Sequence, residues 1–149
     1  MKKKCIVGIL SLILLMGCAG TMPDLGIHNG KLTPCPKTPN CVNSQAVGEK
    51  QYIQSIHYTG TQQEARSLLL QVLESENRTK ILTAQENYIR AAFKSAFFRF
   101  VDDVEFYFPD EQAGETVIHI RSASRVGYSD LGANRKRIER IRNKFQSAR

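Results

Sequence analysis

The sequence predicts a single α+β domain with an antiparallel sheet of about five strands, in the order β-α-β-β-β-β-α, and a long C-terminal helix. Two patterns of helical periodicity frame four short runs that alternate like strands. The element order that results is typical of an antiparallel sheet. The chain of 149 residues is long enough for one ordinary hydrophobic core.

The first strand and the first helix are predicted from consecutive segments. Alternation over residues 51–60 predicts a strand that ends at Gly60. The next four residues, Thr61-Gln62-Gln63-Glu64, have the spacing of a capping box. Apolar side chains then recur at helical spacing: Ala65, Leu68, Leu69, Val72 and Leu73. They predict an amphipathic helix that ends near Asn77 and packs on the core.

Four further strands are predicted over residues 80–84, 88–94, 101–108 and 116–122. The segment PDEQAGE, residues 109–115, predicts a hairpin loop between the last two. Since an antiparallel sheet commonly packs only one face on the core, we expect the helices on one side of it.

The C-terminal helix is predicted to start at Asp130, whose side chain suits an N-cap. One stripe of the helix should pack on the sheet, through Leu131, Asn134, Ile138, Ile141 and Phe145. Four basic residues are expected to project away from that stripe: Lys136, Arg137, Arg140 and Lys144. At its edge, Arg135 and Arg142 can cover apolar surface with their stems.

The positive charge of the chain is concentrated in this helix. Residues 132–149 hold seven basic residues and one acidic residue, Glu139. Such a run indicates either a solvated helix face or an anion-binding face. For anion binding, the candidate residues are Arg125, Tyr128, Arg135, Lys136 and Arg140. Arginine can bind carboxylate or phosphate through a bidentate fork, and tyrosine adds an aromatic face with a polar tip.

The first 17 residues have the organisation of a bacterial lipoprotein signal peptide. Three lysines precede an apolar run, residues 6–16, that is too short to span a bilayer. The run ends Leu15-Met16-Gly17-Cys18, which resembles a lipobox. That resemblance implies cleavage after Gly17, a diacylglyceryl group on the Cys18 thiol, and palmitate or another acyl chain on the new amino terminus. An ordinary secretory signal with an incidental cysteine is the alternative.

Export determines which partners are expected for the mature chain. Its organisation would be a signal peptide over residues 1–17, a tether over 18–33 and one domain over 34–147. Removal of the signal lowers the net charge from +7 to +4. Outside the cytoplasm, an anionic lipid, an acidic wall polymer or an envelope protein is expected as partner, and no nucleic acid. Ala19, and not Asp, follows the cysteine, and by resemblance to the sorting rules of enteric lipoproteins this implies the periplasmic face of the outer membrane in a Gram-negative host.

Two cysteines remain for the folded domain, Cys35 and Cys41. In an oxidising compartment a disulfide between them is the default, and it would close a rigid loop within PCPKTPNCVNSQA. Zinc is the weaker interpretation, because two cysteines supply half of a tetrahedral shell and no second ligand pair follows. A reactive thiol pair is the remaining alternative.

No motif predicts a catalytic residue, a metal site or a cofactor. Asp102 and Asp103 are adjacent in a strand, so their carboxylates should point to opposite faces. We therefore expect a non-enzymatic binding module of the envelope. The rival hypothesis is a small enzyme or a carrier of lipid or another hydrophobic ligand, with a cavity under the sheet.

Two stretches resemble a known family. PCPKTPNCVNSQ near the start of the domain and SRVGYSDLGANRKRIERIR near its end are similar to motifs of a bacterial domain of unknown function, family 1499. FRFVDDVEFYF between them resembles the central segment of that family, and Asn43 stands where the family more usually has serine. Members include lipoproteins and exported proteins. The resemblance implies one exported domain and no particular reaction.

Overall fold

The computed structural model describes residues 20–110 and 114–149. The predicted signal peptide and the predicted lipid site at Cys18 lie outside these residues, as does part of the hairpin loop predicted over 109–115. Among the described residues, no helix combines the length and the apolar character needed to cross a membrane.

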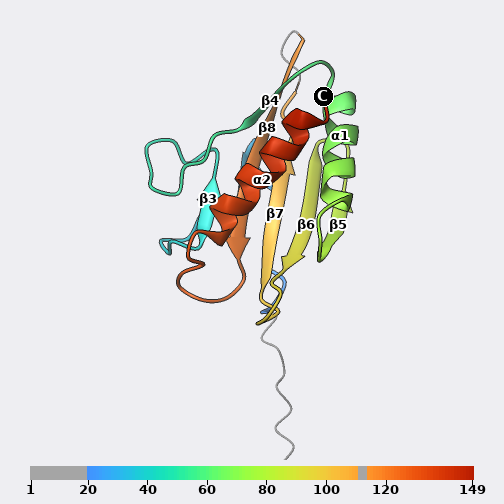
Figure 1. Cartoon of the computed structure of the whole chain (residues 1–149). Coiled ribbons are helices and arrows are strands. Elements are labelled where there is room, and N and C mark those ends of the chain that lie inside the picture. The colour runs from blue at the N-terminus through green and yellow to red at the C-terminus, as the bar shows by residue number, and fades with distance from the viewer. Residues whose placement is uncertain (1–19, 111–113) are drawn as a thin grey trace, which may run out of the picture.

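An antiparallel sheet forms the centre of the molecule (Figure 1). Its six strands in the described chain are β3 (Cys41–Asn43), β4 (Ile56–Thr59), β5 (Thr79–Ala84), β6 (Tyr88–Lys94), β7 (Val101–Tyr107) and β8 (Glu115–Ser124). The order is β3-β8-β7-β6-β5, and β4 also pairs with β8. The first half of β8 pairs with β4 and the second half with β3. The predicted α+β architecture is confirmed.

The edge formed by β3 and β4 differs from the prediction. Residues 41–43 were expected in a loop, but they form β3 and pair with the end of β8. The expected strand over residues 51–60 is shortened to β4, and Tyr52 keeps only an isolated bridge to Asn43. Because β3 pairs with the end of β8, residues 51–53 contact the outer edge of β3 instead: the Asn43 N–H donates to the Gln51 carbonyl at 2.9 Å, and the Ile53 N–H donates to the Asn43 carbonyl at 3.4 Å.

A small hairpin lies within the segment that was expected to be a tether. It consists of β1 (Ile27–His28) and β2 (Lys31–Leu32), paired antiparallel. Leu32 is buried, and its N–H donates to Oε1 of Gln45 at 2.8 Å. Residues 27–32 therefore pack as part of the folded domain.

Both helices cover the same face of the sheet, as predicted (Figure 1). They are α1 (Gln62–Glu74) and α2 (Ala133–Ser147). The capping box of α1 is confirmed: the Thr61 hydroxyl accepts from the Glu64 N–H at 3.3 Å, and the Glu64 carboxylate accepts from the Thr61 N–H at 2.9 Å. The helix ends at Glu74, three residues before the predicted end.

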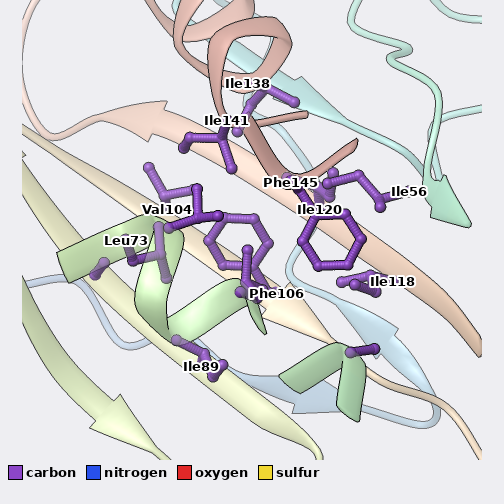
Figure 2. Close-up of a cluster of buried hydrophobic side chains, with 14 of the residues drawn as sticks. Ile56, Leu73, Ile89, Val104, Phe106, Ile118, Ile120, Ile138, Ile141 and Phe145 are labelled. Carbon is purple, nitrogen blue, oxygen red and sulfur yellow. The ribbon is translucent and has the colours of Figure 1, made fainter. Parts of the chain in front are cut away.

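The hydrophobic core fills the space between this face and the helices (Figure 2). Phe106 on β7, Ile120 on β8 and Phe145 on α2 are fully buried there. Each such side chain stabilises the fold by roughly 1.5–3 kcal/mol relative to its exposure to water. The apolar stripes predicted on both helices supply the other side of this layer.

The start of α2 differs from the prediction. The helix begins at Ala133 with Gly132 as its N-cap, and Asp130 lies two residues earlier. Asp130 still satisfies free amides, since its carboxylate accepts from the N–H of Gly132 at 3.0 Å and of Asn134 at 2.7 Å. Leu131 precedes the helix in a left-handed conformation, and 89% of its surface is exposed. It therefore does not belong to the packed stripe.

Candidate functional site

Arg137 was expected to project away from the sheet, and the structure shows the opposite. Its guanidinium lies between α2 and the sheet, where it pairs with the carboxylate of Asp102. It also donates to Oδ1 of Asn134 at 2.7 Å and lies 5.0 Å from the centre of the Phe93 ring. Asp102 points to the helix-covered face, so without Arg137 its charge would be buried unpaired.

Asn134 connects the start of α2 to the two motifs. It is fully buried at a position in the predicted apolar stripe. Its Oδ1 accepts from the Ser122 hydroxyl at 2.5 Å. Its Nδ2 lies 3.0 Å from the Asn40 carbonyl, 3.0 Å from the Ser124 hydroxyl and 2.8 Å from the Asp130 carboxylate. The one polar residue in that stripe was the sequence signal for this role.

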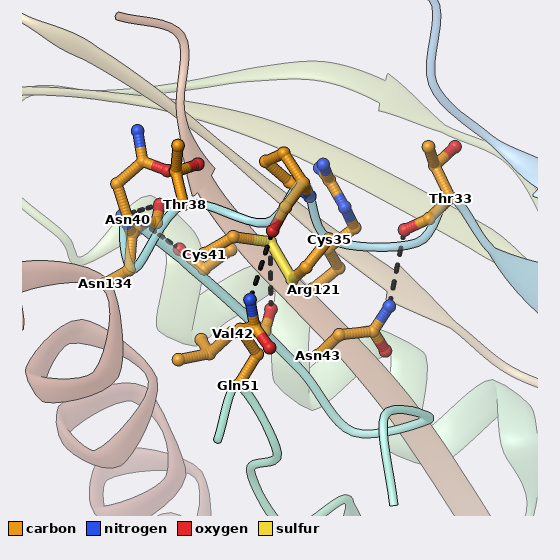
Figure 3. The surroundings of a disulfide bond; sticks show 12 residues. Thr33, Cys35, Thr38, Asn40, Cys41, Val42, Asn43, Gln51, Arg121 and Asn134 are labelled. Atoms are coloured by element: carbon orange, nitrogen blue, oxygen red, sulfur yellow. Dashed lines mark hydrogen bonds between the residues drawn. A yellow bond between two sulfur atoms is a disulfide. The ribbon is translucent and has the colours of Figure 1, made fainter. Parts of the chain in front are cut away.

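A disulfide joins Cys35 and Cys41, with their Cα atoms 5.7 Å apart (Figure 3). The loop it closes is tied to the turn that precedes α2 through Asn40. The Asn40 side chain donates to the Gly127 carbonyl at 2.5 Å, and its own carbonyl accepts from the Ser124 N–H at 3.1 Å. The two motifs, almost a whole domain apart in sequence, therefore lie side by side.

A cleft runs between the disulfide loop and this turn, and we call it the motif cleft. Its lining includes Lys37, Glu49, Lys50, Tyr128 and Arg135. Tyr128 is 72% exposed, and both lysines are exposed. Nη2 of Arg135 donates to the Tyr52 carbonyl at 2.8 Å and to the Lys50 carbonyl at 3.2 Å. Within the described chain, Nε and Nη1 of Arg135 have no protein partner.

Arg125, a second of the three arginines predicted to bind an anion, lies on the opposite face of the sheet. Its guanidinium binds both oxygens of Asp103, at 2.7 and 3.0 Å. The pKa of Arg125 is raised, mainly because of these hydrogen bonds to Asp103. Arg90 also donates to Asp103, at 2.9 and 3.1 Å. The fork of Arg125 is therefore occupied by a carboxylate of the protein.

A second group of charges continues this arrangement on the same face. The Glu105 carboxylate accepts from the Tyr88 hydroxyl at 2.8 Å and from Nη1 of Arg121 at 3.0 Å. The pKa of Glu105 is raised mainly by burial, which outweighs the opposite effect of its cationic neighbour Arg121. Burial, followed by the charge of Glu105, raises the pKa of the Tyr88 hydroxyl.

These six residues form what we call the buried charge network: Tyr88, Arg90, Asp103, Glu105, Arg121 and Arg125. The N-terminal part of the described chain packs over it, and Thr21, Pro23 and Pro36 border the same small pocket as Arg121. The sequence pattern does not predict the network, because alternating acidic residues in a strand also fit a solvated face.

The remaining two predicted binding residues, Lys136 and Arg140, line the groove between the two helices. Arg140 and Lys144 each approach Glu76 to 2.7 Å. Burial opposes ionisation of Glu76, but the two cations prevail and lower its pKa. Lys136 borders the same groove, is exposed, and has no partner within the described residues. Much of the basic face of α2 is therefore neutralised within the protein.

The histidines do not meet the serines of the C-terminal motif. His119 approaches the Ser44 hydroxyl at 3.3 Å, and burial lowers its pKa. His57 contacts Glu115 at 2.8 Å at the other end of the sheet. Over residues 20–110 and 114–149, no group of three or more His, Cys, Asp or Glu side chains is placed to hold a metal ion.

Comparison with known proteins places the chain in a family. No curated protein matches the chain. The crystal structure of TTHA0849 from Thermus thermophilus is similar to this chain, at 8% sequence identity and a TM-score of 0.33. The match covers 72% of this chain and 90% of that protein. Residues 31–145 match the family described as "Protein of unknown function (DUF1499)". This matched segment includes both motifs and the sheet between them. The chain belongs to this family.

Proposed function

We propose that this chain is a lipid-anchored protein of the bacterial cell envelope whose motif cleft binds an anionic group of a ligand or partner. One observation carries the proposal. The cleft unites both motifs, and it holds an arginine with donor groups that no described residue uses. Among the residues predicted to bind an anion, Arg135 and Tyr128 meet in this cleft.

The geometry of Arg135 suits recognition of a carboxylate or a phosphate. Two backbone carbonyls hold Nη2, so the plane of the guanidinium is oriented before any ligand arrives. A preorganised donor loses less conformational entropy on binding. Lys37 and Lys50 add positive charge to the cleft, and Glu49 and Asp130 offset part of the total. The exposed Tyr128 hydroxyl adds a neutral donor.

Anchoring at Cys18 is supported by the order of lysines, apolar run and Leu-Met-Gly-Cys at the start of the chain. The disulfide between Cys35 and Cys41 agrees with an exported protein, because such bonds persist in oxidising compartments. In a Gram-negative host, the periplasmic face of the outer membrane is the proposed location.

The rival hypothesis of a hydrophobic carrier needs a cavity beneath the aromatic strands. Phe106, Phe145 and Ile138 fill the space between the sheet and the helices. A packed interior of this kind leaves no room for a lipid chain without rearrangement. We therefore favour recognition in the open cleft over carriage within the core.

The cleft is tested by calorimetric titration of the full chain with pyrophosphate and with citrate. We expect Arg135→Ala to weaken binding about tenfold or more, because it removes a charge-assisted hydrogen bond. Arg135→Ala also frees the loop at Lys50, so Lys50→Ala and Tyr128→Ser provide variants without that structural effect. Lys31→Ala, an exposed lysine outside the cleft, is the control. Equal affinities for all variants would refute the cleft proposal.

Anchoring is tested by labelling cells with radioactive palmitate. We expect label in the wild-type chain and none in Cys18→Ser, which should also accumulate as unprocessed precursor. Cys5→Ser is the control, because Cys5 lies within the predicted signal peptide. A Cys18→Ser chain that is fully processed and stays in the membrane fraction would show that anchoring does not use this residue.

A further inference from the structure

The connection between β6 and β7 exposes aromatic side chains at one end of the sheet. We call residues 95–100 the aromatic tip. Phe97 is 91% exposed, Phe98 is 74% exposed and Phe100 is 43% exposed. Phe98 stacks on Phe100 with ring centres 5.5 Å apart. Three neighbouring exposed phenylalanines form a patch of the kind that marks an interaction surface.

The backbone holds the aromatic tip in a defined shape. The Ser95 N–H donates to the Phe100 carbonyl at 2.8 Å. The Phe100 N–H donates in turn to the Ser95 hydroxyl at 2.9 Å. These two bonds close the base of the loop, so the phenylalanines project from a turn that is anchored on the sheet.

Four basic residues border a groove that also contacts Ser95 and Ala96 of the aromatic tip, and one of them belongs to the tip itself: Arg78, Lys80, Lys94 and Arg99. None of them pairs with a carboxylate in the described chain. This groove contains no acidic side chain of the described residues. The tip therefore combines apolar side chains with uncompensated positive charge.

The described chain begins beside the aromatic tip (Figure 1). Met22 borders the same groove as Lys94 and Arg99. Gly20 lies close to Arg125, since a Cβ atom added to this glycine would lie only 2.9 Å from Cβ of Arg125. The backbone of Arg125 is in turn next to the tip, because its N–H donates to the Val101 carbonyl at the start of β7. Cys18 is two residues before Gly20, and two residues span at most about 7 Å.

We propose that the aromatic tip docks on the surface of an anionic phospholipid bilayer and orients the anchored domain. The location of the anchor rests on the lipid attachment proposed above, but the docking does not depend on the motif cleft. Phenylalanine rings bury apolar surface when they enter the membrane interface, and basic residues near an anionic leaflet add attraction. A short connection between Cys18 and Gly20 holds the tip at the bilayer.

A second copy of this chain fits the aromatic tip less well than an anionic bilayer does. Two aromatic tips facing each other would bring two sets of basic residues together, with no acidic residue of the described chain in the groove to compensate them. Anionic head groups provide that compensation, and the phenylalanine rings gain an apolar environment at the same surface. Charge complementarity therefore selects the bilayer.

The absence of tryptophan from the chain permits a direct test. Phe98→Trp introduces a single fluorescent reporter at the tip, and Val47→Trp introduces one at a 78% exposed control site on the β3–β4 connection. The full chain, isolated from membranes of the producing cells, is reconstituted in vesicles of phosphatidylethanolamine and phosphatidylglycerol. We expect blue-shifted emission and quenching by brominated lipids for Phe98→Trp only. Equal, water-like emission at both sites overturns the proposal.

A second experiment measures co-sedimentation of residues 19–149, which lack both the predicted signal peptide and the predicted lipid site, with the same vesicles. Replacing Phe97 and Phe98 by serine should reduce binding about tenfold or more, because two apolar rings lose their burial. Arg99→Gln should weaken binding only when phosphatidylglycerol is present. Arg135→Ala should leave vesicle binding unchanged, which separates docking from the cleft. Binding that is insensitive to Phe97 and Phe98, or no binding before the substitution, refutes docking.

Discussion

The two faces of the central sheet solve the same problem of burial with different chemistry. The face under α1 and α2 buries mainly apolar side chains, with Phe106 and Ile120 at its centre. The opposite face of the same strands buries the charge network around Asp103 and Glu105, and the N-terminal part of the described chain packs over it. One strand, β7, serves both faces through the alternation of its side chains.

The difference lies in how each face tolerates change. Apolar burial is non-directional and scales with area, so removing part of one side chain costs free energy in proportion to the void left behind. A buried charge is stable only while its partner remains in place, since an unpaired charge keeps the full desolvation penalty. The charged face is therefore sensitive to the identity of each atom, and the apolar face to volume.

The apolar face should show the largest effect. Phe106→Ala leaves a cavity in the centre of the core and is expected to lower the free energy of unfolding by about 4 kcal/mol. Phe97→Ala is the matched control, because this phenylalanine is exposed and should change stability by less than about 0.5 kcal/mol. Denaturant titration of both variants provides the measurement. Similar losses in the two variants would contradict the assignment of the core.

The charged face should show the next largest effect. Asp103→Asn keeps the shape of the side chain but leaves Arg90 and Arg125 without a compensating charge. We expect the free energy of unfolding to fall by about 3 kcal/mol. Asp110→Asn, at an exposed aspartate, should be nearly neutral. If Asp103→Asn is also neutral in thermal and chemical unfolding, the network does not stabilise the fold.

A smaller effect is expected at the polar junction between α2 and the disulfide loop. Asn134→Ala removes one of the two donors to the buried Asn40 carbonyl and the acceptor of the buried Ser122 hydroxyl. The expected loss is about 2 kcal/mol, the cost of leaving buried polar groups unsatisfied. Asn143→Ala, at an exposed position of the same helix, is the control in the unfolding measurement. An equal response of the two variants would argue against the junction.

The smallest effect should be a pH dependence that comes from Glu105. Because burial raises its pKa in the folded chain, the unfolded chain releases this proton first as the pH rises. The folded state then binds more protons, so the free energy of unfolding falls over the interval above the ordinary glutamate pKa. Glu105→Gln should remove this fall, and Glu86→Gln, at an exposed site, should not. An unchanged pH profile in Glu105→Gln would contradict the prediction.

The sequence predicted the local features of the fold because their signals are short-range. The capping box at Thr61 and the stripe from Ala65 to Leu73 lie within one helix and are confirmed. The strand β6 matches the predicted run over residues 88–94 in both bounds. The β3 strand was missed, because three residues show no periodicity of their own and pair only where the edge of β8 is available.

The candidate site was only partly predictable. Tyr128 and Arg135 were chosen as binding residues and meet in the motif cleft, but Lys37 and Lys50 were not recognised. Arg125 and Arg140 were chosen with them, yet each has a carboxylate partner inside the protein. A basic residue has the same sequence signature whether it faces solvent or a buried acid, so only its neighbours in space distinguish the two.

By itself the sequence determined the α+β class, the periods of its helices and strands, and the family. Those properties depend on side-chain spacing along one stretch of chain. The tertiary structure alone decided that Arg137 points inward to Asp102, that Arg125 binds Asp103, and that the two motifs form a cleft. These outcomes depend on which charges the folded sheet brings together, since a buried charge must find a partner from a distant segment.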